Sequence, residues 1–191
     1  MGIEFIRAKA FHLRGGIWTV LFVVILFMAH PTKLSVAYGI PLVILGQAVR
    51  IWAAGCIGRY RGERVGALSL TTWGPYAFVR NPLYVGNALI GLGWSLMSDP
   101  LAVAVFVITF VLLYTVLIVP HEESFLLKKF GVAYSRYRER TGNFFPINWP
   151  SGRIAGPFDT KVLWESEFHS LLTTVVGSLL IIVKVCFIET A

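Results

Sequence analysis

Long apolar runs separated by short polar segments dominate the chain. The runs occupy residues 16–30, 34–57, 83–97, 101–119 and 168–188. A helix needs roughly 20 mostly apolar residues to cross a bilayer, and each run approaches or reaches that length. The pattern therefore predicts an all-α, polytopic membrane bundle of about five transmembrane helices.

Proline and polar residues between the runs indicate how the helices pair. Ser98-Asp99-Pro100 is a turn signal, so the runs on either side of it are predicted to form a tight antiparallel hairpin. Pro31 and Pro41 are expected to break or kink the hairpin of the first two runs. We interpret residues 1–191 as a single membrane domain, whose parts are an N-terminal hairpin (16–57), a core (59–146) and a C-terminal transmembrane helix (168–188).

A more polar segment separates the fourth run from the fifth. Pro120 suits the first position of a new helix, and Glu122 and Glu123 would then lie in its first turn, where the helix dipole favours them. One face then recurs at helical spacing, comprising Glu122, Leu126, Phe130, Tyr134 and Tyr137. The segment is predicted to be an amphipathic cytosolic helix that ends near Gly142 and lies against the bundle or the headgroups.

Composition and charge support a membrane protein and suggest its orientation. Apolar residues make up 56% of the chain and charged residues 14%, whereas soluble domains usually carry about 25% charged residues. The net charge is +7, with Arg and Lys gathered in residues 1–16, 59–80 and 128–161. The positive-inside rule then predicts a cytosolic N-terminus, cytosolic segments 59–80 and 119–168, and an external C-terminus. Nucleic-acid binding is not expected, because the basic residues form no aromatic-interleaved stripe on a soluble module.

Sulfur and imidazole groups suggest no further site. Cys56 and Cys186 fall at opposite predicted membrane faces and in no CxxC motif, so neither a disulfide nor a redox site is expected. The histidines show no ligand spacing, and no metal site, catalytic triad or P-loop is predicted. The first apolar run has the length of a signal-peptide core but lacks a clear A-x-A site, so we expect a retained first helix.

Charged and aromatic groups gather where the central hairpin is expected to begin and end. Residues 76–84 open the third run and residues 120–123 close the fourth, so both should lie at the same membrane face. A charged residue at the membrane boundary needs a partner, a water-filled cavity or a ligand. Two interpretations of Glu122 and Glu123 are open, namely binding of a cationic ligand, or dipole capping with salt bridges to nearby basic residues.

Two arginines near this face have similar alternatives. Arg80 either serves a site or anchors the topology, and Tyr84 beside it either contributes to that site or is an interfacial aromatic. Arg50 lies within the second run, where it either faces the bundle interior and holds an anion or polar partner, or snorkels to the cytosolic end. Gly91-Leu92-Gly93 lies in an apolar helix with no strand before it, so close helix packing is expected there and a nucleotide loop is not.

Four sequence pieces follow one another in a specific order. They are Tyr76…Arg80-Asn81-Pro82-Leu83-Tyr84-Val85-Gly86, Gly91-Leu92-Gly93-Trp94, Pro120-His121-Glu122-Glu123 and Phe130-Gly131…Tyr134…Tyr137…Phe145-Pro146. In this order they resemble the integral-membrane methyltransferases of the isoprenylcysteine carboxyl methyltransferase and phospholipid methyltransferase superfamily. The resemblance covers about residues 59–146, and it is the combination that is specific, since each piece alone is weak.

The resemblance implies a cofactor and a set of site residues. The superfamily uses S-adenosylmethionine without a Rossmann fold, in a cytosol-facing pocket formed by a helical hairpin and the amphipathic helix after it. Residues 59–146 would thus be the cofactor-binding core. The implied cofactor contacts are Tyr76, Asn81, Pro82, Leu83, Tyr84, Glu122 and Glu123. An anionic carboxylate suits a sulfonium cation, because a low dielectric strengthens their attraction.

Two positions depart from the carboxyl methyltransferase pattern. Asn81 replaces a His, and Asn-Pro is closer to the phospholipid methyltransferases, as is Leu92-Gly93-Trp94. Ile118 replaces an Arg that serves the substrate side in the carboxyl methyltransferases. The second departure argues against a prenylcysteine carboxylate as the substrate.

These observations predict a membrane methyltransferase whose acceptor is a lipid or a lipidated molecule entering from the bilayer. The acceptor type is open between a phospholipid amine and an isoprenylcysteine carboxylate. Arg80 and Glu122 are the candidate catalytic residues, and Arg50 and Arg80 are candidates for holding the acceptor head. The alternatives are an NADPH-dependent membrane reductase of the steroid-reductase type and a non-enzymatic membrane adaptor. A prokaryotic inner membrane, with the site facing the cytosol, is the expected location.

Overall fold

The computed structural model describes residues 2–57, 69–150 and 154–189. Its elements in chain order are α1 (Ile3–Met28), α2 (Lys33–Ile57), the 3-10 turn η1 (Gly74–Ala77), α3 (Pro82–Ser98), α4 (Pro100–Phe110), the π-helical stretch η2 (Val111–Ile118), α5 (Val119–Phe130), α6 (Val132–Arg140), the π-helical stretch η3 (Leu163–Glu167) and α7 (Phe168–Glu189). In the part of the chain described, the only extended pairing is one isolated parallel bridge, between Val79 and Gly142. The predicted all-α class is confirmed.

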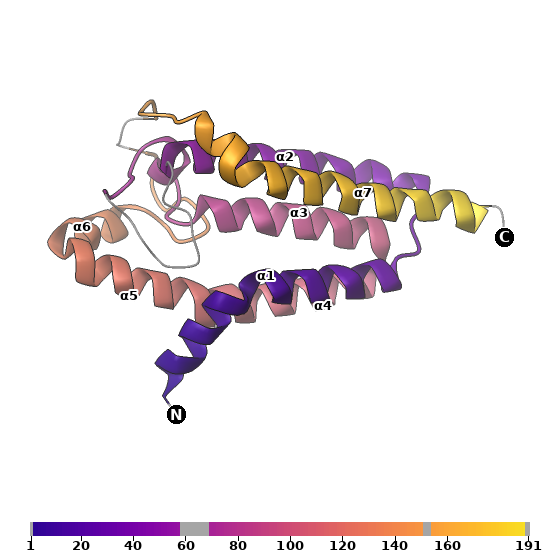
Figure 1. Cartoon of the computed structure of the whole chain (residues 1–191), viewed down its shortest axis with the longest axis horizontal. Helices are drawn as coiled ribbons and strands as arrows, with labels where there is room; N and C mark the ends of the chain where they lie inside the picture. The colour runs from indigo at the N-terminus through magenta and orange to yellow at the C-terminus, as the bar shows by residue number, and fades with distance from the viewer. Residues whose placement is uncertain (1, 58–68, 151–153, 190–191) are drawn as a thin grey trace.

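The helices form an elongated bundle with different contents at its two ends (Figure 1). The helix α3 packs against α2 on one side and α4 on the other, while α1 runs along the α4–η2 stretch and α7 contacts α2. The N-terminus, α5 and α6 lie toward one end, which we call the loop end, and α7 finishes at the opposite end (Figure 1). This separation matches the predicted distribution of the polar segments and the chain termini.

Close backbone contact joins α2 to α3. A Cβ atom added to Gly93 would lie 2.7 Å from the carbonyl oxygen of Gly39, and one added to Gly86 would lie 2.7 Å from the carbonyl oxygen of Gly46. Contacts shorter than about 3 Å are repulsive. Any residue larger than glycine at these positions would therefore push the two helices apart. The predicted packing role of the Gly91–Gly93 segment is confirmed, since Gly91 also faces the Phe106 ring of α4.

Apolar side chains from five helices fill the bundle interior. The main buried cluster comprises Leu21, Ile25, Ala29, Val43, Ile90, Trp94, Met97, Phe106 and Ile181. The Trp94 indole also donates a 2.9 Å hydrogen bond to the Ser178 hydroxyl, which satisfies its polar atom at the contact between α3 and α7. The core thus ties the first four helices to the C-terminal helix.

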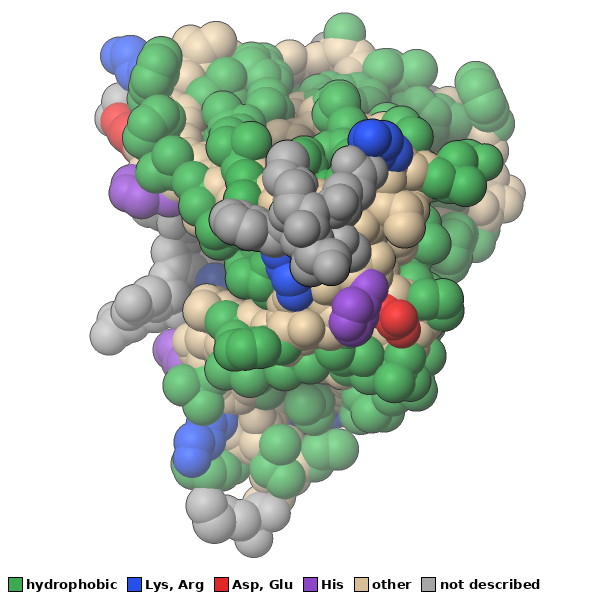
Figure 2. Space-filling model, turned by 90° about the vertical axis from the view of Figure 1, so that its right-hand side faces the viewer, with side chains coloured by type: hydrophobic (Ala, Val, Ile, Leu, Met, Phe, Trp, Pro, Cys, Tyr) green, Lys and Arg blue, Asp and Glu red, His purple; other side chains and the backbone are tan. Residues whose placement is uncertain are grey.

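The outer surface is apolar as well, which is expected of a protein immersed in lipid. Four helical stretches are long and apolar enough to span a membrane, namely Ile3–Met28, Lys33–Ile57, Pro100–Phe130 and Phe168–Val185. The helix α3 has 17 residues, so it is about 25 Å long and lies along α2 within the bundle. Large apolar side chains such as Phe27 (81% exposed) point outward. Figure 2 shows that hydrophobic side chains also cover most of the end opposite the loop end.

Two helix boundaries differ from the sequence-based expectation. The first helix begins at Ile3 rather than near residue 16, so the basic N-terminal stretch is helical. Pro120 does not begin a separate helix, because the helix from Pro100 runs on to Phe130. A proline removes one backbone donor, and the π-helical turns of η2 just before it already depart from regular i to i−4 bonding. The carbonyl of Val116, four residues before Pro120, accepts a 3.2 Å hydrogen bond from Arg7 instead.

The predicted amphipathic helix is also interrupted. Gly131 adopts φ 52° and ψ −122°, which separates α5 from α6 and turns the chain back toward the bundle. Only glycine adopts this backbone conformation readily. Regular spacing of apolar residues on both sides of Gly131 made the segment look continuous, and Tyr134 on the second piece is buried as expected.

Candidate functional site

The two motif-bearing segments meet at the loop end of the bundle. Asn81 is the N-cap residue of α3, which begins at Pro82, while Glu122 lies in the first turn of α5 and Glu123 follows it. The tight turn at Asp99 makes α3 antiparallel to the following helix, so both segments return to the same end. The Tyr84 hydroxyl donates a 2.5 Å hydrogen bond to Oε1 of Glu122. The predicted proximity of the two segments is confirmed, and the use of these residues for a cofactor stays a prediction.

Arg80 connects the start of α3 to the polar segment. Its Nε donates a 2.8 Å hydrogen bond to Oε1 of Glu123, and the two side chains are only 12% and 17% exposed. One terminal nitrogen donates to the carbonyls of Arg138, at 3.1 Å, and of Thr141. Arg80 therefore neutralises the second acidic residue and holds the C-terminal end of α6, which is a positioning role beside any contact with an acceptor.

Backbone hydrogen bonds reinforce these Arg80 contacts, which we call the Arg80 clasp. The Arg80 amide donates to the Gly142 carbonyl at 2.8 Å, and the Asn81 amide donates to the Asn143 carbonyl at 3.2 Å. The Asn81 side-chain amide donates to the side-chain oxygen of Asn143. Asn81 is thus positioned by the segment after α6, and it does not cap α3 through its side chain.

Tyr76 lies on η1 and is buried. Its ring belongs to a small apolar cluster with Ala53 and Cys56 of α2, against which Leu83 also packs. Its carbonyl accepts a 2.8 Å hydrogen bond from the Tyr137 hydroxyl. Pro82 is buried at the first turn of α3. Of the predicted cofactor contacts, Tyr76 and Leu83 thus lie in or against this apolar cluster and Pro82 is buried, and their use for a cofactor stays a prediction.

Two tyrosines of α6, Tyr134 and Tyr137, lie near Glu123. Burial raises the pKa of Tyr134 well above its ordinary value, and the negative charge of Glu123 raises that pKa further. Burial likewise raises the pKa of Tyr137, with Tyr134 and Glu123 adding to the effect and Arg80 opposing it. Both phenols stay protonated through the neutral range, and the Tyr137 hydroxyl donates its hydrogen to the Tyr76 carbonyl. The sequence placed both on the amphipathic face and in the fourth motif piece, without assigning either of them a role.

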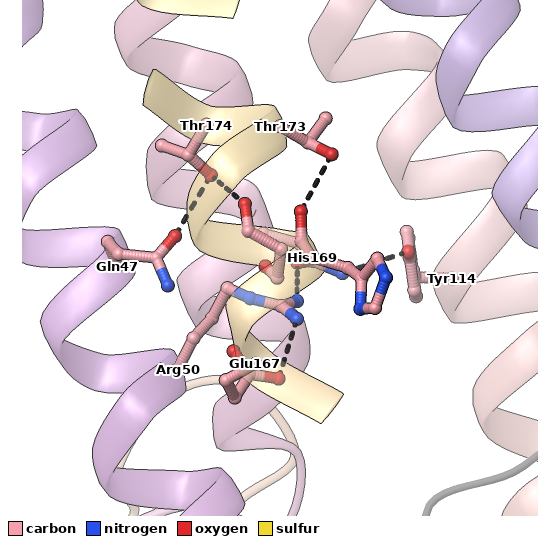
Figure 3. Close-up of polar contacts among 9 residues, drawn as sticks. Gln47, Arg50, Tyr114, Glu167, His169, Thr173 and Thr174 are labelled. Carbon is pink, nitrogen blue, oxygen red and sulfur yellow. Dashed lines mark hydrogen bonds and ion pairs between the residues drawn. The ribbon is translucent and has the colours of Figure 1, made fainter. Parts of the chain in front are cut away.

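A second polar cluster lies deeper in the bundle (Figure 3). Arg50 of α2 faces inward, where it donates a 3.1 Å hydrogen bond to Oε1 of Glu167 and a further one to the side-chain oxygen of Asn87. The side chains of Arg50 and Glu167 are 11% and 2% exposed. Of the two interpretations of Arg50, the one with a polar partner in the bundle interior is confirmed.

Tyr114 links the deeper cluster to the loop end. Its hydroxyl accepts hydrogen bonds from the indole of Trp18 and, at 3.3 Å, from the amide of Asn87. The Tyr114 ring lies 4.5 Å from the Tyr84 ring, measured between centroids, and Tyr84 in turn binds Glu122. A continuous series of contacts therefore joins Glu122 to Arg50.

Sequence reasoning missed Asn87, Tyr114 and Glu167. Asn87 could have been found as a strongly polar residue in an apolar run, because such residues are costly in a membrane unless they are paired. Glu167 immediately precedes the fifth run and resembles an ordinary flanking charge. Tyr114 carries no signal of its own, since tyrosines are common in membrane helices. For metals, the described residues contain no group of three or more histidine, cysteine or acidic side chains able to hold an ion.

Comparison with known proteins gives the chain a family. Residues 34–133 match the family model described as phospholipid methyltransferase. A cobalt-zinc-cadmium resistance protein of Cupriavidus metallidurans is 35% identical over 116 residues, which are 60% of this chain and 50% of that protein. A nickel-cobalt-cadmium resistance protein of Alcaligenes xylosoxydans xylosoxydans is 34% identical over 146 residues, which are 70% of this chain and 64% of that protein.

The chain thus spans between half and just under two thirds of the length of these two relatives. No solved structure gives a significant match. The matched family region contains most of α2, all of α3 and α4, and α5 with its acidic pair, which are the elements that bring Tyr84 and Glu122 together. The chain belongs to the phospholipid methyltransferase family, within the superfamily that also contains the isoprenylcysteine carboxyl methyltransferases.

Proposed function

We propose that the protein transfers a methyl group from S-adenosylmethionine to a lipid or another membrane-partitioned acceptor. The observation that carries the proposal is the carboxylate of Glu122, held by the Tyr84 hydroxyl at the base of the α3–α4 hairpin, in a chain of the phospholipid methyltransferase family. Glu122 is the first acid of the Pro-His-Glu-Glu motif, and in this proposal it faces the positive charge of the methyl donor.

The residues around Glu122 suit such a donor. A carboxylate in partly buried surroundings attracts a sulfonium cation more strongly than it would in water. The aromatic rings of Tyr84 and Tyr114 offer electron-rich faces next to it, and these also attract cations. Tyr76, Asn81, Pro82 and Leu83 supply the apolar floor and the polar rim. The Arg80–Glu123 pair keeps α6 over this end of the bundle.

When bound, S-adenosylmethionine supplies an electrophilic methyl group. The chain then has to align the acceptor atom with that group and exclude water, and alignment of this kind can lower a barrier by several kcal/mol. In this scheme the Glu122 carboxylate attracts the positive charge of the methyl donor, and Arg80 positions α6 over the site. A covalent protein nucleophile is not needed, which agrees with a site made of acids, amides and phenols.

Isothermal titration of the detergent-purified protein with S-adenosylhomocysteine tests the proposal. Wild-type protein is expected to bind, and Glu122→Gln is expected to lose most of the affinity. Glu139→Gln, which changes an exposed acid of α6, is the matched control and should bind like wild type. Protein that is folded and monodisperse but binds only NADPH would establish the reductase alternative instead, and protein that binds neither compound would favour the adaptor.

The names of the two relatives suggest a biological setting for the same activity. Both are called metal resistance proteins, and the described residues contain no group of three or more His, Cys, Asp or Glu side chains that could hold a metal ion. We propose that any contribution to metal tolerance operates through methylation of a membrane component. Cells lacking the gene should regain cobalt or cadmium tolerance with the wild-type gene and not with Glu122→Gln. Equal rescue by both genes would separate tolerance from methyl transfer.

A further inference from the structure

The first helix reaches the loop end from outside the matched family region. The family match begins at residue 34, so α1 does not belong to it. In the structure α1 contacts both η2 and α5, the helix that carries Glu122. Arg7 anchors this contact, because its Nε donates a 3.2 Å hydrogen bond to the Val116 carbonyl. The N-terminal half of α1 is therefore fixed at the end of the bundle that holds the candidate site (Figure 1).

Three residues at helical spacing form the face of α1 that meets this end. Phe11, Arg14 and Trp18 are separated by three and four residues, so their side chains lie on one face of the helix. Phe11 is buried, and its ring lies 5.6 Å from the His121 ring, measured between centroids. Trp18 donates a hydrogen bond to the Tyr114 hydroxyl. Arg14 lies between these two contacts, about one helical turn from each.

The two contacts lie on either side of the Tyr84–Glu122 hydrogen bond. His121 directly precedes Glu122 in α5, and the Tyr114 ring lies 4.5 Å from the Tyr84 ring, measured between centroids. Tyr84 also packs against the buried cluster that contains Phe11. The face of α1 that carries an arginine is therefore directed at the carboxylate of the candidate site.

The Arg14 guanidinium is held in place by the preceding turn of its own helix. Its central carbon lies 3.9 Å from the centroid of the Phe11 ring, and one terminal nitrogen donates a 2.6 Å hydrogen bond to the Phe11 carbonyl. Its positive charge is close enough to the Tyr84 hydroxyl to act on it, and that hydroxyl binds Glu122. A cation from α1 and an anion from α5 thus lie at the same hydroxyl.

The other two arginines near this end are paired on other elements. Arg80 pairs with Glu123 and holds the end of α6, while Arg50 pairs with Glu167 deeper in the bundle. Of these three arginines, Arg14 is therefore the one that the fold brings to the carboxylate of the candidate site.

We propose that Arg14 binds the carboxylate at the amino-acid end of the methyl donor. This inference rests on the proposed methyl transfer and adds a donor-binding residue to it. S-adenosylmethionine ends in an amino acid, so at neutral pH it carries an ammonium and a carboxylate beside its sulfonium. Glu122 alone would match the positive groups only, whereas Glu122 with Arg14 matches both signs. The planar guanidinium also suits a carboxylate, because it can donate two parallel hydrogen bonds to it.

The same residue makes the site selective for donors that retain this carboxylate. An analogue without it would bring only positive or neutral groups to the Arg14 guanidinium. Like charges repel, and they repel more strongly in a partly buried site than in water. Specificity of this kind combines an attractive contact with the right ligand and a repulsive contact with the wrong one.

Isothermal titration of the full-length protein in detergent tests the inference. The two ligands are S-adenosylhomocysteine and S-adenosyl-3-thiopropylamine, which is the same molecule without its carboxylate. Arg14→Met removes the charge and keeps an apolar side chain over Phe11, and Arg14→Lys keeps the charge without the planar fork. The matched control is Lys9→Met, which removes an exposed cation from the same helix.

Wild-type protein and Lys9→Met are expected to bind S-adenosylhomocysteine about tenfold more tightly than the amine analogue. Arg14→Met should lose about tenfold in affinity for S-adenosylhomocysteine and bind the two ligands alike, while its affinity for the amine analogue does not fall. Arg14→Lys should show an intermediate preference. If Arg14→Met does not fold, Arg14→Lys decides the question, since a preference as large as that of wild type would overturn the inference.

Three other results would contradict a role in carboxylate binding. An undiminished preference in Arg14→Met would remove Arg14 from the donor site. An equal loss of affinity for both ligands would show that Arg14 only supports the local structure. Tighter binding of S-adenosylhomocysteine by Arg14→Met would show that the guanidinium competes with the donor for Glu122.

The wild-type protein separates this inference from the proposed function. If wild type binds S-adenosylhomocysteine but shows no preference over the amine analogue, methyl transfer is retained and the carboxylate contact of Arg14 is lost. If folded wild type binds neither ligand, the proposed methyl transfer fails, and the role of Arg14 fails with it.

Discussion

The Tyr84 hydroxyl donates a 2.5 Å hydrogen bond to Oε1 of Glu122, between residues 38 positions apart in the chain. This bond joins the first turn of α3 to the first turn of α5 and fixes the direction of the carboxylate. Hydrogen bonds to charged groups contribute about 1.5–3 kcal/mol.

Removal of that hydroxyl should weaken binding of the methyl donor. Tyr84→Phe keeps the ring that contacts Tyr114 but leaves the Glu122 carboxylate less well oriented. We expect the affinity for S-adenosylhomocysteine to fall about tenfold, which corresponds to about 1.4 kcal/mol. Titration calorimetry measures this, with the exposed Tyr38→Phe as the control. An unchanged affinity in Tyr84→Phe would remove Tyr84 from the proposed site.

The clasp made by Arg80 should stabilise α6 more than the rest of the bundle. Arg80→Met removes the ion pair with Glu123 and the bonds to two carbonyls of the α6 end, so we expect a loss of about 2 kcal/mol. Hydrogen exchange should increase chiefly in residues 132–143. Arg136→Met, at an exposed position of the same helix, should change little. A uniform increase in exchange over all helices would contradict a local clasp.

The buried pair of Arg50 and Glu167 should be strongly coupled. Glu167→Leu leaves a buried guanidinium without its carboxylate, and removal of one member of a buried pair costs about 3–5 kcal/mol. The double variant Arg50→Met/Glu167→Leu should cost less than the sum of the two single variants, because it leaves no unpaired charge. Unfolding in detergent, analysed as a double-mutant cycle, measures the coupling. Additive effects would show that the ion pair is not the source of the stability.

Glycine positions between α2 and α3 should not tolerate a methyl group. Gly93→Ala places a Cβ atom 2.7 Å from the Gly39 carbonyl oxygen, so the helices must separate, and we expect a loss of about 1–3 kcal/mol. Gly15→Ala is the matched control, since that position lies in α1 with no atom within 4 Å of the added Cβ. The control should be neutral or slightly stabilising because alanine favours helices. Similar midpoints for the two variants would contradict the close packing.

Alkaline pH should destabilise the protein through Tyr134. Burial and Glu123 raise its folded-state pKa, so its contribution to stability is fully present below the unfolded pKa of about 10. Above that pH the unfolded chain releases the proton while the folded chain retains it, and stability falls by about 1.4 kcal/mol per pH unit for this group. Tyr134→Phe should flatten the decline in thermal midpoint between pH 10 and 11. A parallel decline in both proteins would place the cause elsewhere.

Some features followed from sequence because they depend on local physics. The length and hydropathy of the runs predicted the helices, and α2, α3 and α7 begin and end within two residues of their predicted bounds. The turn at Asp99 predicted that α3 and the following helix are antiparallel, so Tyr84 and Glu122 had to lie at the same end. The order of the motifs also indicated the family, and Asn81 and Ile118 indicated the branch before any comparison.

Helix continuity required the tertiary structure. Pro120 carries the sequence signature of a helix start, yet the helix passes through it, because π-helical turns precede it and Arg7 of α1 pairs with the Val116 carbonyl. The residues from Glu122 to Tyr137 looked like one continuous helical face, and the positive φ of Gly131 ends α5 within it. In both cases the helix boundary is decided by tertiary contacts or backbone angles. The local sequence pattern contains no information on either.

The choice of partners was decided by the tertiary structure alone. Sequence could identify Arg50 as a costly charge that needs a partner, but it could not select Glu167, 117 positions away, or the amide of Asn87. Helical periodicity fixes which residues share a face of one helix, because it depends on the residues near in sequence. Which faces then meet depends on how glycines, core side chains and turns pack several helices together, and that packing places Arg50 beside Glu167 and Asn87.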